Sequence, residues 1–202
     1  MKSTTTYLLG ALLVGSFSLA TAPPAQAQKK PVKEAEKINK KRNKLQADSS
    51  PYSKDQLQYD AEFAVAASSS NMLEIALGKL AQQKAIAMEV KEWGKRMEQE
   101  HGQAEQQLQA IAERAHIALP QMMGKEDRDI YDDIDDRKYF GFDKKYMRDL
   151  QELHKRTIAR FADAAAKASN PELRTYATEM LPKLREHEEI TAQLFERASD
   201  RK

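Results

Sequence analysis

The chain of 202 residues contains no cysteine, and it has only seven glycines and seven prolines. Without cysteine it can form neither a disulfide framework nor a thiolate metal site, and it has no cysteine for lipid attachment. Glycine and proline are scarce, whereas Ala, Glu, Gln, Lys and Leu dominate and favour helices. The sequence contains neither the Ser-His-Asp order of a hydrolase triad nor a glycine-rich phosphate loop, so it gives no support for a hydrolase or a nucleotide-binding protein. We therefore expect an all-α protein.

The first 27 residues have the pattern of a secretory signal peptide. Lys2 precedes the apolar run YLLGALLVG at residues 7–15, and the small residues Ala25 and Ala27 predict cleavage after Ala27. The apolar run is about half the length that spans a bilayer, so we expect no transmembrane anchor. The prediction is an exported protein of the periplasm or cell envelope.

The next segment, residues 28–56, is basic and poor in large apolar side chains, which predicts a disordered arm or linker. Residues 28–47 carry eight basic and two acidic side chains, a net charge of +6, whereas the rest of the mature chain is acidic. Two interpretations are open: a solvated linker, or an arm that binds an anionic membrane surface or cell-wall polymer through residues 28–44. An exported chain with an acidic domain predicts no nucleic-acid partner.

Residues 57–201 are long enough for one domain with a single core. Apolar residues three and four apart predict long helices at about residues 60–82 and 86–116. A third long helix is predicted to begin at Asp143 and a fourth at Asn170, because both residue types are good N-caps. Pro171 and Glu172 suit the first turn of the fourth helix, which predicts the same start.

The connections predict how these four helices are arranged. The first and second helices, and the third and fourth, are separated by only a few residues, so each pair forms an antiparallel hairpin. About 25 residues separate the second helix from the third, with room for one short helix around Ile130 and Ile134. A long crossover between the second and third helices predicts a ferritin-like four-helix bundle.

Metal-binding residue types recur at one level of this arrangement. His101, His154 and His187 lie on the apolar faces of the second, third and fourth helices, and a rise of about 1.5 Å per residue places them within about 5 Å of one level. Glu74 of the first helix lies near the same height, and Glu98 precedes His101 by one turn in the Glu-x-x-His spacing of ferritin-like sites. Burying these groups unpaired would cost several kcal/mol, which a bound cation offsets. All five are therefore predicted metal ligands, with Glu98 as ligand or as hydrogen-bond partner of a ligand.

The pattern favours one metal ion over a di-iron centre. Gln151 and Leu184 occupy the positions, three residues before the other two histidines, where a di-iron protein carries glutamate. The ligand types suit zinc, manganese, iron or copper and do not choose among them. A metal with an open coordination position allows redox or stress-protective chemistry, although the pattern identifies no catalytic residue. The alternative is a non-catalytic envelope protein whose histidines form a polar core and whose basic arm attaches it.

Four stretches carry a resemblance to a known family: FAVAASSSNMLEIALGKLA (63–81), VKEWGKRMEQEH (90–101), GFDKKYMRDLQELH (141–154) and LPKLREH (181–187). They resemble the bacterial family called domain of unknown function 4142, of the ferritin-like group, over nearly all of the predicted domain. The resemblance implies an exported four-helix bundle in which the positions of Glu74, His101, His154 and His187 recur as polar core residues. It implies no activity, since the family is named for lacking one.

Overall fold

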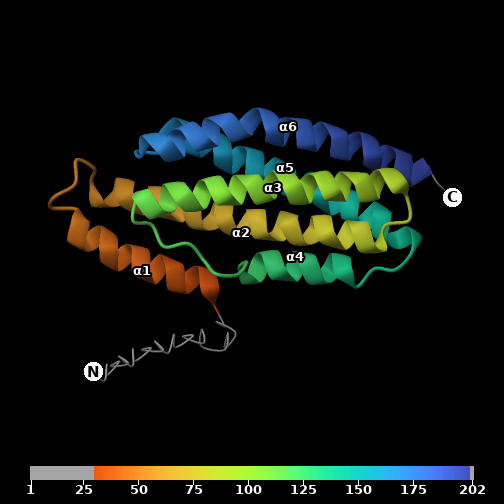
Figure 1. The fold of residues 1–202 in the computed structure, drawn as a ribbon, viewed down its shortest axis with the longest axis horizontal. Helices are drawn as coiled ribbons and strands as arrows, with labels where there is room; N and C mark the ends of the chain where they lie inside the picture. The colour runs from red at the N-terminus through yellow and green to blue at the C-terminus, as the bar shows by residue number, and fades with distance from the viewer. Residues whose placement is uncertain (1–29, 201–202) are drawn as a thin grey trace, which may run out of the picture.

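The computed structural model describes residues 30–200, which form six α-helices and no strand within that range (Figure 1). The helices are α1 (Pro31–Gln46), α2 (Lys54–Lys84), α3 (Met88–Arg114), α4 (Lys125–Asp135), α5 (Phe140–Lys167) and α6 (Pro171–Asp200). The all-α prediction is confirmed. The predicted signal peptide lies outside the described residues, and none of the described helices is long and apolar enough to cross a membrane.

The four long helices α2, α3, α5 and α6 lie side by side along the long axis of the molecule (Figure 1). α2 packs mainly against α3, and α5 against α6, because residues 85–87 and 168–170 form short turns between them. Between α3 and α5 the chain returns along the molecule through α4, so α3 and α5 run in the same direction, as predicted (Figure 1). α4 is the predicted short helix around Ile130 and Ile134.

The third long helix was predicted to begin at Asp143, and the structure shows a different start. α5 begins earlier, at Phe140, so Asp143 lies inside its first turn instead of capping it. The Asp143 carboxylate accepts hydrogen bonds from the backbone N–H groups of Ile86, at 3.0 Å, and Ala87, at 2.9 Å. It thereby satisfies two backbone donors of the α2–α3 turn and ties this turn to α5.

A second aspartate makes the equivalent link at the opposite end. The buried carboxylate of Asp60 on α2 accepts hydrogen bonds from the backbone N–H groups of Ser169, at 2.9 Å, and Asn170, at 2.8 Å. Asn170 is the N-cap of α6, as predicted, because its Oδ1 accepts from the N–H groups of Glu172 and Leu173. The α2–α3 and α5–α6 turns are therefore each anchored to another long helix by one buried carboxylate.

The predicted disordered arm, residues 28–56, contains a helix instead. α1 packs along α2 and buries Ala35, Asn39 and Asn43, which are four residues apart (Figure 1). The amide of Asn39 donates to the carbonyl oxygen of Ala118 at 2.9 Å and accepts from its N–H at 2.7 Å. α1 therefore holds the connection between α3 and α4. The buried face consists of small and amide side chains, so the shortage of large apolar residues gave the wrong prediction.

Two glycines allow α2 and α3 to approach closely. A Cβ atom at Gly78 would lie 2.5 Å from the carbonyl oxygen of Gly94, and one at Gly94 would lie 2.6 Å from the Cβ of Ala81. Larger residues at these positions would force the two helices apart. Gly78 follows Glu74 by one turn, so this contact sets the distance between α2 and α3 beside the polar layer described next.

Candidate metal centre

A polar layer divides the apolar core into two clusters. Along α3, Met97 belongs to one cluster and Ala104 to the other, and His101 lies between them. His154 on α5 and His187 on α6 lie in the same layer, and the three histidines are between 0% and 1% exposed. Three different helices therefore deliver one imidazole each to the centre of the molecule.

The three histidines converge with Glu74. Each offers a ring nitrogen, and these nitrogens lie within 4.8 Å of one another. From α2, Oε2 of Glu74 lies 2.9 Å from Nε2 of His101 and 3.2 Å from Nε2 of His154. Two ligands held about 2 Å from one metal ion lie roughly 3 Å apart, so these separations match those around a single ion. The structure thus brings Glu74, His101, His154 and His187 together, as the sequence predicted.

Glu98, the fifth predicted ligand, is not part of this group. Its Oε2 accepts a hydrogen bond from Nε2 of Gln82 at 2.7 Å, its Oε1 lies 3.8 Å from Nζ of Lys79, and its side chain is 33% exposed. Each residue turns a helix by about 100°, so Glu98 is rotated by about 60° from His101 around α3. That rotation directs it toward α2 and away from the histidines.

Glu100 is the second carboxylate of the centre, and the sequence analysis missed it. Its Oε2 lies 2.6 Å from Nε2 of His187, and Nε of Arg96 donates to its Oε1 at 2.6 Å. Burial alone raises the pKa of Glu100, but the hydrogen bonds from Arg96 and His187 outweigh burial and lower it. An ionised Glu100 accepts only, so Nε2 of His187 donates. The sequence carried no signal for this contact, because the rotation of α3 that directs Glu100 toward His187 depends on packing.

The Glu74 carboxylate is ionised in spite of its burial. Burial raises the pKa of Glu74, but the charges and hydrogen bonds of His101 and His154 lower it to well below its usual range. The side chain is fully enclosed, and Oε1 has no hydrogen-bond partner. Glu74 therefore places a negative charge between the histidines, and its Oε1 remains without a partner.

Unpartnered polar atoms concentrate around this centre. Within residues 30–200, four buried side-chain atoms have no hydrogen-bond partner, namely Glu74 Oε1, Trp93 Nε1, Tyr146 Oη and His187 Nδ1, whereas Nε2 of His101 contacts only Oε2 of Glu74. The ring of Trp93 meets that of His187 edge-on, at 5.4 Å between centroids. Burial, and then the nearby charge of Glu74, raise the pKa of Tyr146. Buried polar atoms are nearly always satisfied in native proteins, so these atoms are available to a polar ligand such as water or a metal ion.

The comparisons with known proteins identify the domain that contains the centre. Residues 45–194 match a family described as a domain of unknown function, DUF4142. The chain belongs to the DUF4142 family. Helices α2 to α5 and most of α6 fall within the DUF4142 domain, whereas most of α1 precedes it. Neither a curated protein nor a solved structure matches the chain. The family resemblance is therefore confirmed, and the function has to be argued from the site.

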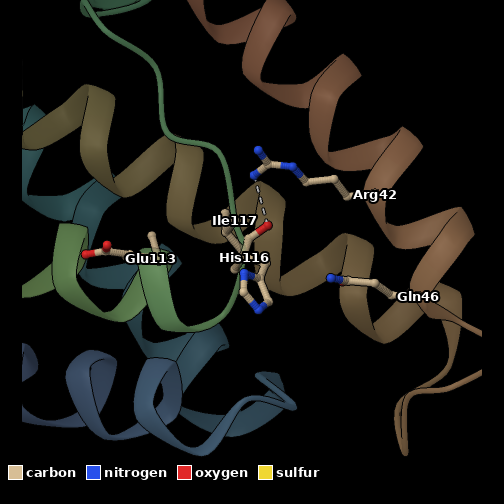
Figure 2. Close-up of a pocket in the computed structure, with 6 residues that line it drawn as sticks. Arg42, Gln46, Glu113, His116 and Ile117 are labelled. Carbon is tan, nitrogen blue, oxygen red and sulfur yellow. Dashed lines mark hydrogen bonds between the residues drawn. The ribbon is translucent and has the colours of Figure 1, made fainter.

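A surface hollow at one end of the DUF4142 domain does not join the centre. It measures about 500 Å³ and lies between α1 and the end of α3, lined by Arg42, Gln46, Glu113, His116 and Ile117 among others (Figure 2). Nη1 of Arg42 donates to the carbonyl oxygen of His116 at 3.1 Å. His116, the remaining histidine, is exposed and has a positive φ of 55°. The hollow is open to solvent and gathers no buried charged group, so the histidine cluster is the candidate site.

Proposed function

We propose that this DUF4142 protein is an exported, ferritin-like four-helix bundle that binds one transition-metal ion through His101, His154, His187 and Glu74. The observation that carries the proposal is the convergence of three ring nitrogens, within 4.8 Å of one another, on an ionised carboxylate. Oε2 of Glu74 hydrogen-bonds with Nε2 of His101, at 2.9 Å, and with Nε2 of His154, at 3.2 Å. The same atoms suit one cation, because binding a metal ion displaces the protons from the ring nitrogens.

The unpartnered atoms favour a metal over a purely structural polar core. A core built from histidines for packing would satisfy its members internally, since an unsatisfied buried group costs about 1–3 kcal/mol. Here Oε1 of Glu74 and Nδ1 of His187 both lack a hydrogen bond. Coordination of one ion uses atoms of this kind and recovers that free energy.

One ion fits the centre better than two. A di-iron centre needs several carboxylates that bridge the metals. Only Glu74 lies among the three histidines, because Arg96 draws Glu100 toward the surface, where its side chain is 26% exposed. The set of three imidazoles and one carboxylate suits zinc, manganese, iron or copper. Iron, manganese or copper would supply redox chemistry, consistent with a stress-protective role.

Metal analysis of the protein from its native exported fraction tests this proposal. We expect about one transition-metal ion per chain when purification avoids both added metal and chelators, and elemental analysis also identifies the ion. A matched variant, His116→Ala, removes the histidine outside the cluster and should retain the same metal content. A wild-type protein that arrives metal-free and binds none of the four ions at micromolar concentration contradicts the proposal.

A second candidate function, attachment to an anionic surface, is favoured by the outer face of α1. The exposed lysines on this face are Lys33, Lys37, Lys40, Lys41 and Lys44. Beside them Ile38 and Leu45 are 37% and 73% exposed, one heptad apart on the same side of the helix. A lysine-rich helix face beside exposed apolar side chains suits an anionic membrane surface or cell-wall polymer. We propose this contact as the role of α1, in addition to the metal centre.

Neutralising the lysines tests attachment better than deleting the segment, because deletion would also remove the buried Ala35 and Asn39 and lower the melting temperature. Changing the five α1 lysines to glutamine should weaken binding to anionic vesicles more than tenfold, since each basic residue contributes about 1 kcal/mol at such a surface. Co-sedimentation at low and high salt measures this, because salt screens such contacts beyond about 10 Å at 0.1 M. The matched control neutralises five exposed lysines elsewhere: Lys54, Lys95, Lys138, Lys144 and Lys183. Equal binding by both variants would leave α1 without this role.

A further inference from the structure

Asn71 of α2 is buried beside the metal centre, and both polar atoms of its amide are engaged. Its Nδ2 donates to Oε2 of Glu105 at 3.2 Å and to Oη of Tyr176 at 3.3 Å. Its Oδ1 lies 3.1 Å from Nδ1 of His101. Asn71 is 3% exposed, so water does not compete for these contacts. The amide therefore connects a ligand histidine to a hydrogen-bonded group on α3 and α6.

Glu105 determines which way the Asn71 amide faces. The Glu105 carboxylate accepts a hydrogen bond from Oγ of Ser68 at 2.7 Å and from Nε2 of Gln109 at 3.1 Å, as well as from Asn71. With three donors directed at it, this carboxylate acts as an acceptor. A reversed amide would place Oδ1 against it, two acceptors face to face. The amide oxygen consequently faces His101.

We propose that Asn71 is a positioning residue for the metal centre, an inference that rests on the proposed function. Because the amide oxygen only accepts hydrogen bonds, Nδ1 of His101 carries the proton. In the neutral ring the lone pair of His101 is then on Nε2, the atom that lies 2.9 Å from Glu74 Oε2. Asn71 thus presents the ligating nitrogen of His101 toward the centre before any ion arrives.

Glu100 has the corresponding effect on His187 from the opposite side. Its carboxylate holds the proton on Nε2 of His187, at 2.6 Å, which leaves the lone pair on the unpartnered Nδ1. His101 and His187 therefore offer different nitrogens to the same ion. The partner of a ligand histidine fixes its tautomer and orientation, and its loss typically weakens metal binding by about 10–100-fold.

The test combines a spectroscopic measurement on the metal-free protein with zinc titrations of variants. Nitrogen-15 NMR of histidine-labelled protein should show the Nδ1–H tautomer at His101 before zinc is added. Asn71→Leu, which removes the acceptor, should lose this preference and bind zinc about 10–100-fold more weakly in a chelator competition. The double variant Asn71→Asp with Glu105→Gln exchanges the amide and the carboxylate. The carboxylate at position 71 still accepts from His101, and the amide at position 105 donates to it, so the double variant should restore both the tautomer and most of the zinc affinity.

Ser70→Ala is the matched control, because Ser70 is a buried polar residue next to Asn71 whose hydroxyl pairs with Thr157 and not with a histidine. It should leave the tautomer and the zinc affinity unchanged. An Nδ1–H tautomer in wild-type protein that binds no zinc would overturn the proposed function alone. Zinc binding with an Nε2–H tautomer at His101, or with unchanged affinity in Asn71→Leu, would overturn the role of Asn71 alone.

Discussion

Replacing His154 with alanine is expected to abolish stoichiometric metal binding, together with the gain in thermal stability that metal gives the wild type. The change removes one of three ring nitrogens and one of the two histidine contacts of Glu74 Oε2. An ion present at about 1,000 times its dissociation constant stabilises the folded state by about 4 kcal/mol. In a domain of this size that corresponds to a rise in melting temperature of roughly 10 °C.

Thermal melts with and without zinc, together with equilibrium dialysis, measure both parts of this expectation. The quantity to compare is the gain on adding zinc, because the alanine also leaves a cavity that lowers the melting temperature of the metal-free variant. His116→Ala serves as the control, since His116 is exposed and outside the cluster, and should keep the full gain. If His154→Ala still binds one equivalent with the wild-type gain, His154 is not a ligand.

The level of the candidate metal centre was predictable from the sequence, whereas its second carboxylate, Glu100, was not. Helical rise is constant, so counting residues brought His101, His154 and His187 to the same height. The rotation of α3 about its axis depends on packing, including the contact between Gly78 and Gly94. That rotation directs Glu98 toward α2 and Glu100 toward His187. The spacing of apolar residues does not define the rotation of a helix closely enough to predict which of the two glutamates faces the histidines.

Long-range polar contacts account for the other differences between sequence and structure. α1 was predicted to be disordered because its composition is basic, but its buried face is made of alanine and asparagine. The partner of Asn39 is Ala118, 79 residues away. Asp143 has the residue type of an N-cap, and it does bind backbone N–H groups, but those of Ile86 and Ala87 in another turn. Residue type indicated the hydrogen-bonding capacity in both cases, and the fold determined the partner.

The metal-free protein is expected to lose stability between pH 6.5 and pH 4 because of His187. Burial, and then the charges of the other two histidines, lower the pKa of His187 from 6.5 to about 4, although its hydrogen bond to Glu100 opposes them. In this window the imidazole binds a proton in the unfolded chain but not in the folded one. Stability rises with pH wherever the unfolded state binds more protons, so acidification destabilises the fold. The difference in pKa corresponds to about 3 kcal/mol.

The check on this prediction compares the wild type with His187→Gln, because Glu74 also titrates and contributes to both proteins. Glu74 acts in the same sense at lower pH, because its depressed pKa gives stability that is present above its ordinary value of 4.5 and lost as pH falls below it. Denaturant unfolding of metal-free protein from pH 7 to pH 4 should therefore show a steeper loss in the wild type than in His187→Gln, which cannot titrate but can still donate to Glu100. Parallel pH profiles for the two proteins would show that His187 has the same pKa in the folded and the unfolded states, which contradicts the prediction. With saturating zinc the wild-type loss should become steeper still, because protons then compete with the ion for the same ring nitrogens.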